Sequence, residues 1–593
     1  MRYLAATFFL IGAVSTAQAQ QAADAVQPEP ASQGAFQAMS PRVAAALEAK
    51  EARTPVTASN WMVAAANPHA AEAGASVLEA GGTAADALVA VQAVLGLVEP
   101  QSSGLGGGAF LVYYDAASGD LTTLDGRETA PLASTPRLFQ TDEGGPLGFF
   151  DAVVGGRSVG TPGTPALMQA VHEKWGSQDW AALLEPAIAL ADGGFAVSPR
   201  LASMVARDAE RLQSYGPTAD YFLPGGVPLQ AGDVLTNQQY ADTLRAMASG
   251  GADAFYTGEI ARDIVATVRG VPGNPGVLSQ RDLSIYRVKE RAPVCVQFRA
   301  HEVCGMGPPS SGALTVGQIL GMLDAYDLSA GPNDPTVRRL IGDASRLAFA
   351  DRGRYMADSD FVPMPTRGLV DPAYLAERSG LLSGDDALPE VAPGTPAFDH
   401  ALLFADDASL ELPSTSHFVI VDAQGNVASM TTTIENGFGS RLMVRGFLLN
   451  NELTDFSFRS HRDGVPIANR VEPGKRPRSS MAPTIVMKDG KPVLAIGSPG
   501  GSRIIGYVAE SIIAWADWGM DVQQAVSVPH AVNRFGTYDV EEGTSAETLT
   551  EPLTQLGYEV NARALTSGLH AIEIGDTLQG GADPRREGIA LGQ

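Results

Sequence analysis

The chain has 593 residues, of which 45% are hydrophobic and 18% are charged, and its formal net charge is -25. A nucleic-acid-binding protein needs a basic face, so this charge argues against a nucleic-acid partner. No stretch after the N-terminal region reaches the roughly 18 uncharged apolar residues that a membrane-spanning helix needs, so we expect no membrane insertion of the mature chain.

The N-terminus is typical of a secretory signal. Arg2 supplies a positive charge, residues 3–14 form an apolar core, and Ala17-Gln18-Ala19 is a small-residue cleavage site. We therefore expect a signal peptide over residues 1–19 and a periplasmic or secreted mature protein; the alternative is an uncleaved anchor. Residues 20–54 are rich in Ala, Gln, Pro and Ser, which predicts a flexible leader or an arm on the surface.

Helical and strand-like segments then alternate along the chain. The spacing of apolar residues predicts helices over residues 69–80, 83–97, 162–192, 237–248, 313–325, 337–351 and 504–518. A glycine-rich turn at 103–108 precedes an apolar strand at 109–114. It lacks the Lys-Ser/Thr of a phosphate-binding loop, so it favours close backbone packing over phosphate binding. Periodicity alone thus predicts a mixed α/β or α+β protein.

The two cysteines, Cys295 and Cys304, fall in a predicted hairpin that turns at Arg299-Ala300. In that register they are directly opposed as a non-hydrogen-bonded pair, where Cα atoms come closest. This distance is compatible with a disulfide, and export would permit one. The alternative is a pair of small buried residues. No His-Glu-x-x-His or Cys-x-x-Cys motif occurs, so we expect no metal and no cofactor.

A hydroxyl-rich hairpin is the strongest chemical feature. Residues 380–414 have the Gly, Pro and Asp content of a flexible, accessible segment, and a strand begins just after Thr415. If the hairpin centres on Gln424, Thr415 lies opposite Thr433. A threonine at the head of a strand suits a nucleophile whose base is its own α-amino group, which requires a peptide cut before Thr415. The alternative is an ordinary Thr-rich edge hairpin.

Motifs around this hairpin occur in an order that is similar to one known family. They lie at residues 103–108, 125–131, 308–312, 415–417, 433–435, 449–456, 475–481, 498–503 and 580–588. Together they resemble the γ-glutamyltransferase (γ-glutamyltranspeptidase) family of self-cleaving N-terminal-nucleophile hydrolases, from about residue 55 to the end.

The resemblance implies an α+β fold, a four-layer αββα sandwich shared by a large subunit, residues 55–414, and a small catalytic subunit, residues 415–593. It implies that Thr415 takes the γ-glutamyl group of glutathione or a related amide and passes it to water, an amino acid or a peptide. Residues 456–477 correspond to the family's variable lid.

The resemblance also implies roles for single residues. Thr433 would position the nucleophile, and Gly500 and Gly501 would form the oxyanion hole. The substrate's carboxylate and ammonium would be bound by Arg127, Ser479, Ser480, Glu452, Asp455 and Glu435. His417 lies on the same strand face as Thr415, and we favour a structural role for it.

Two other functions stay open at this point. An acylase of the same superfamily would remove glutaryl groups, which carry no α-ammonium, so the presence of both Asp455 and Glu452 favours γ-glutamyl donors. A non-catalytic periplasmic binding protein with the same fold would not cleave itself.

Overall fold

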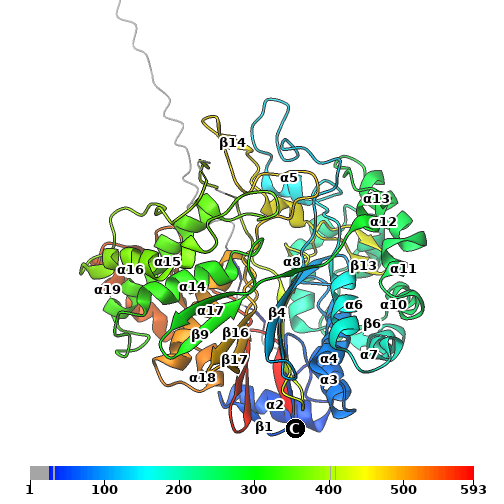
Figure 1. Cartoon of the computed structure of the whole chain (residues 1–593). Helices are drawn as coiled ribbons and strands as arrows, with labels where there is room; N and C mark the ends of the chain where they lie inside the picture. Colours follow the sequence, from blue (N-terminus) through cyan, green and yellow to red (C-terminus); the bar gives the residue numbers. More distant parts are fainter. Residues whose placement is uncertain (1–25, 28, 31–33, 401–402, 408) are drawn as a thin grey trace, which may run out of the picture.

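The computed structural model describes residues 26–27, 29–30, 34–400, 403–407 and 409–593 (Figure 1). The predicted signal peptide lies outside the described residues. Part of the predicted flexible leader is instead helix α2, Pro41–Glu51, which Ser40 caps and which has proline at its first turn. Its side chains Val43, Ala46 and Leu47 are buried in the main core, so this part of the segment is an ordered component of the fold.

Two seven-stranded antiparallel sheets form the centre of the molecule. The first has the order β1-β22-β21-β17-β16-β9-β8: Val56–Ala58, Leu578–Ala582, His570–Ile574, Lys491–Gly497, Thr484–Lys488, His301–Gly305 and Val294–Phe298. The second has the order β23-β2-β10-β11-β3-β4-β7: Ile589–Gly592, Met62–Ala65, Ser416–Val421, Val427–Thr433, Gly108–Asp115, Asp120–Gly126 and Lys289–Arg291.

Helices cover the outer face of each sheet (Figure 1). On the second sheet lie α3, α4 and α6, with α7 packed on α4 and α10 packed on α7: Pro68–Glu79, Ala84–Val98, Thr164–Trp175, Trp180–Gly193 and Gln238–Gly250. On the first sheet lie α14 and α17, with α15 packed on α14: Gly312–Leu323, Ile504–Ala516 and Pro335–Tyr355. Each predicted helix is thus present, and the 162–192 segment divides into two helices, α6 and α7.

Strand β10 shows why the layers stack in this way. Its residues alternate between two cores, with Phe418 and Ile420 packed under the helices of the second sheet and Val419 and Val421 packed between the sheets. Both faces of the strand are buried, which explains its continuous apolar sequence. The predicted four-layer αββα sandwich is confirmed.

Smaller elements surround these layers. The remaining helices are α5, α8, α9, α11, α12, α13, α16, α18 and α19: Phe149–Val153, Pro199–Leu212, Gly216–Phe222, Asp253–Tyr256, Gly258–Gly270, Gln280–Ile285, Pro372–Gly380, Val522–Val526 and Thr550–Gln555. A three-stranded sheet joins β18, β19 and β20: Ala531–Asn533, Thr537–Glu541 and Glu559–Arg563. In the described part of the chain, no helix combines the length and apolarity needed to cross a membrane.

The edge hairpin β8–β9 contains the disulfide. Cys295 pairs with Cys304 in the strand register, and the two sulfur atoms are bonded. Their Cα atoms are 4.1 Å apart, the close approach of a non-hydrogen-bonded pair.

The predicted lid carries a short hairpin of its own. Strands β14, His461–Arg462, and β15, Val465–Pro466, pair antiparallel within residues 456–477. Phe456, the first residue of this segment, and Val471, which follows the hairpin, are both buried in a small cluster that also contains Leu453.

Candidate active site

The proposed nucleophile lies at the junction between a loop and strand β10. The β10–β11 register pairs Ser416 with Thr432, which places Thr415 opposite Thr433. The two hydroxyl oxygens are 3.2 Å apart, within hydrogen-bonding distance. The backbone N–H of Glu435 donates to the Thr433 hydroxyl at 2.9 Å and fixes its orientation. The hairpin thus brings the two threonines together as the sequence predicts.

The glycine-rich turn at residues 103–108 supports the end of β11. A side chain at Gly107 would place its Cβ 2.0 Å from the carbonyl oxygen of Thr433. No residue with a side chain could occupy that position without displacing β11. The turn therefore serves close backbone packing beside the site.

The peptide bond before Thr415 is buried and intact. Ser414 and Thr415 are only 1% and 5% exposed, and Thr415 has a φ of 88°, which is rare for a β-branched residue. Such a conformation costs on the order of 1–3 kcal/mol and persists only where the surroundings impose it. Arg586 donates to the Thr415 carbonyl at 3.3 Å. Cutting the bond would free Thr415 from this constraint.

A backbone donor already contacts the carbonyl of that bond. The N–H of Gly500 donates to the Ser414 carbonyl oxygen at 3.1 Å. Gly500 has a φ of 134° and Gly501 a φ of 59°, both in the region that glycine tolerates. A Cβ on Gly501 would lie 2.8 Å from the carbonyl oxygen of Leu412, so the loop packs tightly against the segment that precedes the bond.

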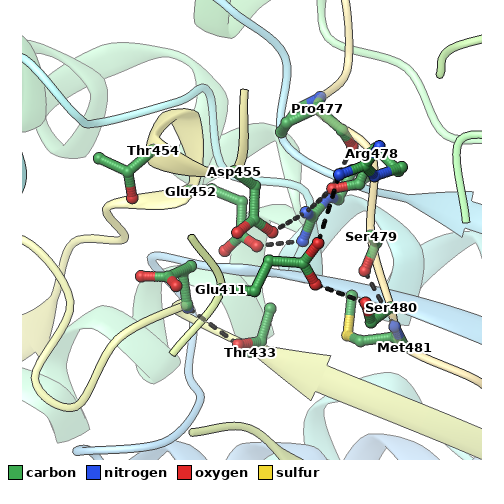
Figure 2. Close-up of polar contacts among 12 residues, drawn as sticks. Glu411, Thr433, Glu452, Thr454, Asp455, Pro477, Arg478, Ser479, Ser480 and Met481 are labelled. Atoms are coloured by element: carbon green, nitrogen blue, oxygen red, sulfur yellow. Dashed lines mark hydrogen bonds and ion pairs between the residues drawn. The ribbon is translucent and has the colours of Figure 1, made fainter. Parts of the chain in front are cut away.

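A buried arginine, Arg127, and two acids, Glu452 and Asp455, form the charged part of the site; Figure 2 labels the two acids. Arg127 forms ion pairs with Glu452 and Asp455. It also donates to the carbonyl oxygens of Pro477 and Arg478, at 3.2 and 2.9 Å. Burial raises the pKa of the Asp455 carboxyl, and the charge of Glu452 adds to this, against the opposing effect of Arg127. The acids therefore share one cation, and a substrate ammonium would supply a second positive charge.

Glu435 is a third acid in this cavity. Its carboxylate accepts a hydrogen bond from the Asn451 side chain, and its backbone φ is 72°. Burial, together with the charges of Asp455 and Glu452, raises the pKa of Glu435 well above its ordinary value. Asn451 lies within the motif at residues 449–456, and no role was predicted for it.

The predicted site residues converge on one cavity. It is lined by Arg127, Glu411, Leu412, Thr415, Thr433, Glu435, Glu452, Asp455, Ser479, Ser480, Met481, Gly501 and Ile504. Its free volume is about 20 Å³, room for about one water molecule. Gly500 lies just outside this lining, on the side of the scissile carbonyl. In the uncut chain the cavity therefore has no room for a substrate.

Glu411 and Arg352 are two further residues of this region for which the sequence predicted no role. The carboxylate of Glu411 fills the cavity, accepts a hydrogen bond from Ser480 and forms an ion pair with Arg352. Burial alone would raise the pKa of Glu411, but the charges of Arg352 and Arg478 and the Ser480 hydrogen bond lower it to about 2. Nothing local in the sequence marks Glu411, because its partners are 59 or more residues away.

His417 lies on strand β10 itself, two residues after Thr415. Its Nδ1 lies 2.9 Å from the Thr431 hydroxyl, and burial lowers its pKa well below the usual value. A Cβ on Gly497 would lie 2.3 Å from the ring, so the imidazole fills the space that this glycine leaves. These contacts are those of a neutral, packed histidine.

The fold and this constellation define the class of N-terminal-nucleophile hydrolases, and comparisons with known proteins identify the family within it. A family model described as Gamma-glutamyltranspeptidase matches residues 70–593. A glutathione hydrolase proenzyme from Bacillus subtilis (strain 168) is 37% identical over 546 residues, covering 90% of this chain and 91% of the relative. The chain belongs to the γ-glutamyltranspeptidase family, which confirms the resemblance.

Solved structures agree with this assignment. The crystal structure of cephalosporin acylase from Bacillus halodurans is similar with a TM-score of 0.80 and 26% identity, covering 91% of this chain and 97% of that one. The γ-glutamyltranspeptidase of Helicobacter pylori is 36% identical with a TM-score of 0.54, covering 55% of this chain and 94% of that chain.

Proposed function

We propose that the chain cleaves itself between Ser414 and Thr415 and then acts as a γ-glutamyltransferase and glutathione hydrolase. The two products are a large subunit ending at Ser414 and a small subunit beginning at Thr415, which stay together as a heterodimer. The observation that carries this proposal is the pairing of the Thr415 and Thr433 hydroxyls at 3.2 Å, beside a carbonyl held by the Gly500 N–H.

Self-cleavage starts with attack of the Thr415 hydroxyl on the Ser414 carbonyl carbon. The Ser414 carbonyl oxygen becomes negatively charged in this step, and it already accepts a hydrogen bond from the Gly500 N–H. A donor that is in place before the reaction stabilises the oxyanion. The peptide C–N bond breaks as an ester forms, and water then hydrolyses the ester. This leaves a free α-amine on Thr415 and a carboxylate on Ser414.

In the cut enzyme the same hydroxyl attacks the side-chain amide of a γ-glutamyl donor. The α-amine of Thr415, with a reference pKa near 7.7–8.0, accepts the hydroxyl proton near neutral pH. The amine of the donor leaves with a proton, and a γ-glutamyl ester remains on Thr415. Water then gives hydrolysis, whereas an amino acid or peptide amine gives transfer.

The charged cavity suits the glutamyl end of such a donor. Asp455, Glu452 and Glu435 offer negative charge to the α-ammonium, and Arg127, Ser479 and Ser480 offer donors to the α-carboxylate. Glutathione and related γ-glutamyl amides are the proposed donors, in the periplasm or outside the cell.

A second candidate is the removal of glutaryl groups from β-lactam side chains. The similarity to the B. halodurans cephalosporin acylase favours it. The three acids around the cavity argue for a donor with an ammonium group, because the only cation paired with them, Arg127, already serves both Glu452 and Asp455 among the described residues, and a glutaryl chain would add no positive charge.

The test is the intact mass of the purified protein beside that of Thr415→Ala, followed by assay of γ-glutamyl-p-nitroanilide. We expect two fragments that meet at Ser414 and Thr415 in the wild type, one chain in the variant, and p-nitroaniline release only from the cut protein. A wild-type chain that stays whole would contradict the proposal.

A further inference from the structure

Arg586 is a buried arginine that contacts the backbone of the nucleophile from outside the catalytic cavity. It lies between strands β22 and β23 and is 6% exposed. Its guanidinium donates to two backbone carbonyl oxygens, that of Thr415 at 3.3 Å and that of Thr566 at 3.5 Å. It does not line the cavity that contains the Thr415 hydroxyl. The contact therefore fixes the main chain of Thr415 and does not involve its hydroxyl.

Arg586 forms no ion pair with any residue that the structure describes, and its Nε has no hydrogen-bond acceptor there. The neighbouring Arg200, in contrast, pairs with Glu29 and with Glu99, each at 3.2 Å. A buried cation without an acid in contact with it costs stability. Stabilisation of the fold therefore does not explain why an arginine occupies this position.

The side chain of Arg586 is nevertheless held in one place. A Cβ on Gly568 would lie 2.8 Å from its Cδ, so the arginine stem fills the space beside that glycine. Lys50 of helix α2 donates to the backbone carbonyls of Arg586 and Gly588, at 2.9 and 2.7 Å. Burial, with repulsion from Arg200, lowers the pKa of Arg586 to about 10. The guanidinium is still charged near neutral pH.

Cleavage would create an amine next to this charge. The φ torsion of Thr415 includes the Ser414 carbonyl carbon, so the cut removes that constraint, but the Thr415 carbonyl oxygen that Arg586 contacts remains. The carbonyl oxygen and the nitrogen of one residue are about 3–3.5 Å apart, so the guanidinium lies no more than about 7 Å from the new α-amine. At such a distance in a buried site, one positive charge disfavours a second.

The acids of the cavity act on the amine in the opposite direction. Four of them line the cavity around Thr415: Glu411, Glu435, Glu452 and Asp455. Negative charges favour the ammonium form, which cannot accept the hydroxyl proton. Arg127 pairs with two of these acids and offsets only part of their charge. The amine therefore needs a further cation nearby to be neutral at neutral pH.

The other charged groups around Arg586 are two cations and four acids. They are Arg200, Lys50, Glu29, Glu99, Asp583 and Glu587. Burial raises the pKa of Glu99, and it raises that of Glu587 to about 7, so the negative charge of this group is reduced near neutral pH. Arg586 is the member of this cluster that donates to Thr415.

Three titratable side chains close to this point are uncharged at neutral pH: His417, His570 and Tyr507. Burial lowers the pKa of both imidazoles and raises that of the phenol. Arg503, which precedes helix α17, is charged but pairs with Asp539 at 2.6 Å. The positive charge nearest to the nucleophile on this side is therefore that of Arg586.

We propose that Arg586 is a positioning residue for the nucleophile of the cut enzyme: it holds Thr415 through the carbonyl oxygen, and its charge favours the neutral α-amine that accepts the hydroxyl proton. The same site can then bind a donor ammonium with its acids and still contain a neutral amine. This inference rests on the proposed function, because it takes Thr415 as the nucleophile.

The test is the pH dependence of kcat and KM for γ-glutamyl-p-nitroanilide in cut wild type, Arg586→Met and Arg586→Lys. The acid limb of kcat/KM reports the ionisation of the base in the free enzyme. We expect Arg586→Met to move this limb by about one pH unit or more to higher pH, because the amine loses a repelling charge. At pH 7 its kcat should fall about tenfold, with KM changed no more than about threefold. Arg586→Lys keeps the charge and should keep the limb.

The matched control is Arg339→Met. Arg339 on helix α15 is 4% exposed, donates twice to the Leu382 carbonyl oxygen, and also has an Nε without an acceptor among the described residues. Its loss should lower stability but leave the acid limb where it is in the wild type. A limb that moves equally in both methionine variants, or in neither, would overturn the proposal.

A second measurement on the wild type serves where Arg586→Met does not mature. Cyanate carbamylates neutral amines, so the cut enzyme is treated between about pH 5 and 9, and the N-terminal peptide of the small subunit is analysed by mass spectrometry. The dipeptide Thr-Ser in the same reaction gives an unperturbed amine, with a reference pKa near 7.7–8.0. We expect the pKa of the Thr415 amine to be about one unit or more lower. An equal or higher pKa would contradict the role of Arg586.

The two proposals fail in different ways. A wild-type chain that stays whole, or a cut one that releases no p-nitroaniline, would refute the proposed function and this inference with it. A cut and active wild type whose acid limb does not depend on Arg586 would refute this inference alone.

Discussion

The backbone N–H of Gly500 lies 3.1 Å from the carbonyl oxygen of Ser414, so the donor proposed for the substrate's oxyanion already binds the carbonyl of the bond to be cut. One loop would therefore serve two reactions in succession, self-cleavage and γ-glutamyl transfer. Both reactions pass through a tetrahedral oxyanion at the same hydroxyl, so a defect in this loop should slow both.

Gly500→Ala tests this dual role. Alanine does not tolerate a φ of 134°, and its Cβ would lie 3.0 Å from the Tyr507 ring, so the peptide must rotate and its N–H must move. We expect self-cleavage to slow by about 100-fold, followed over time by intact mass. The control is Gly490→Ala, at a φ of 76° with nothing within 4 Å, which should cost about 1 kcal/mol of stability and cleave normally. Equal cleavage rates for the two variants would contradict the role of Gly500.

Thr433→Val tests the neighbouring hydroxyl. Valine keeps the shape of the side chain but removes the group that lies 3.2 Å from the Thr415 oxygen. We expect self-cleavage and anilide turnover to fall by about 10- to 100-fold, a typical cost for a lost positioning contact. Thr432→Val is the matched control, because the Thr432 hydroxyl has no hydrogen-bond partner among the described residues. Similar behaviour of the two variants would show that the hydroxyl of Thr433 has no special role.

The hairpin could be predicted from the sequence because its two strands and the turn that joins them are adjacent in the chain. An apolar run at residues 418–421 and a second strand-like run at 427–433 flank a turn, and centring the hairpin on that turn gives the register, which fixes which residues face each other. The pairing of Cys295 with Cys304 was predicted in the same way, from the position of the turn in the β8–β9 hairpin. The flexible leader was wrongly predicted over the residues of helix α2. Ser40 followed by Pro41 is a typical helix start, but the Ala- and Gln-rich composition of the segment favoured flexibility.

The cavity itself could not be predicted in this way. Glu411 meets Arg352 and Ser480 only because α15 and the loop after residue 477 are packed side by side by the layers of the sandwich. Such contacts leave no periodic trace in the sequence. The roles of Arg127 and Gly500 were inferred from family resemblance, and the structure adds that Arg127 is paired with two acids before any substrate binds.

Asp455→Asn tests the ammonium subsite. The change removes a negative charge facing the donor's α-ammonium, and glutaryl donors have no such group. We expect kcat/KM for γ-glutamyl-p-nitroanilide to fall about 100-fold, while glutaryl-p-nitroanilide changes by no more than about threefold. Asp463→Asn, in the exposed turn of the β14–β15 hairpin, is the control and should match the wild type. Equal losses on both donors would refute the specificity for γ-glutamyl groups.

Two buried histidines should make the stability of the uncut chain depend on pH. Burial lowers the pKa of His570 to about 3 and that of His417 well below its usual value. The unfolded chain takes up a proton at each ring near pH 6.5, whereas the folded chain does so only at much lower pH. Between these values the unfolded state binds more protons, so the free energy of unfolding falls as the pH decreases.

The measurement is denaturant unfolding of the uncut Thr415→Ala chain at pH 6.5, 5.5 and 4.5. Each histidine should contribute up to about 1.4 kcal/mol of lost stability per pH unit. His570→Asn should make the profile shallower by that amount, because neither of its ring nitrogens has a hydrogen-bond partner among the described residues to replace. The exposed His461→Asn is the control and should retain the wild-type slope. An unchanged slope in His570→Asn would mean that His570 is protonated in the folded chain.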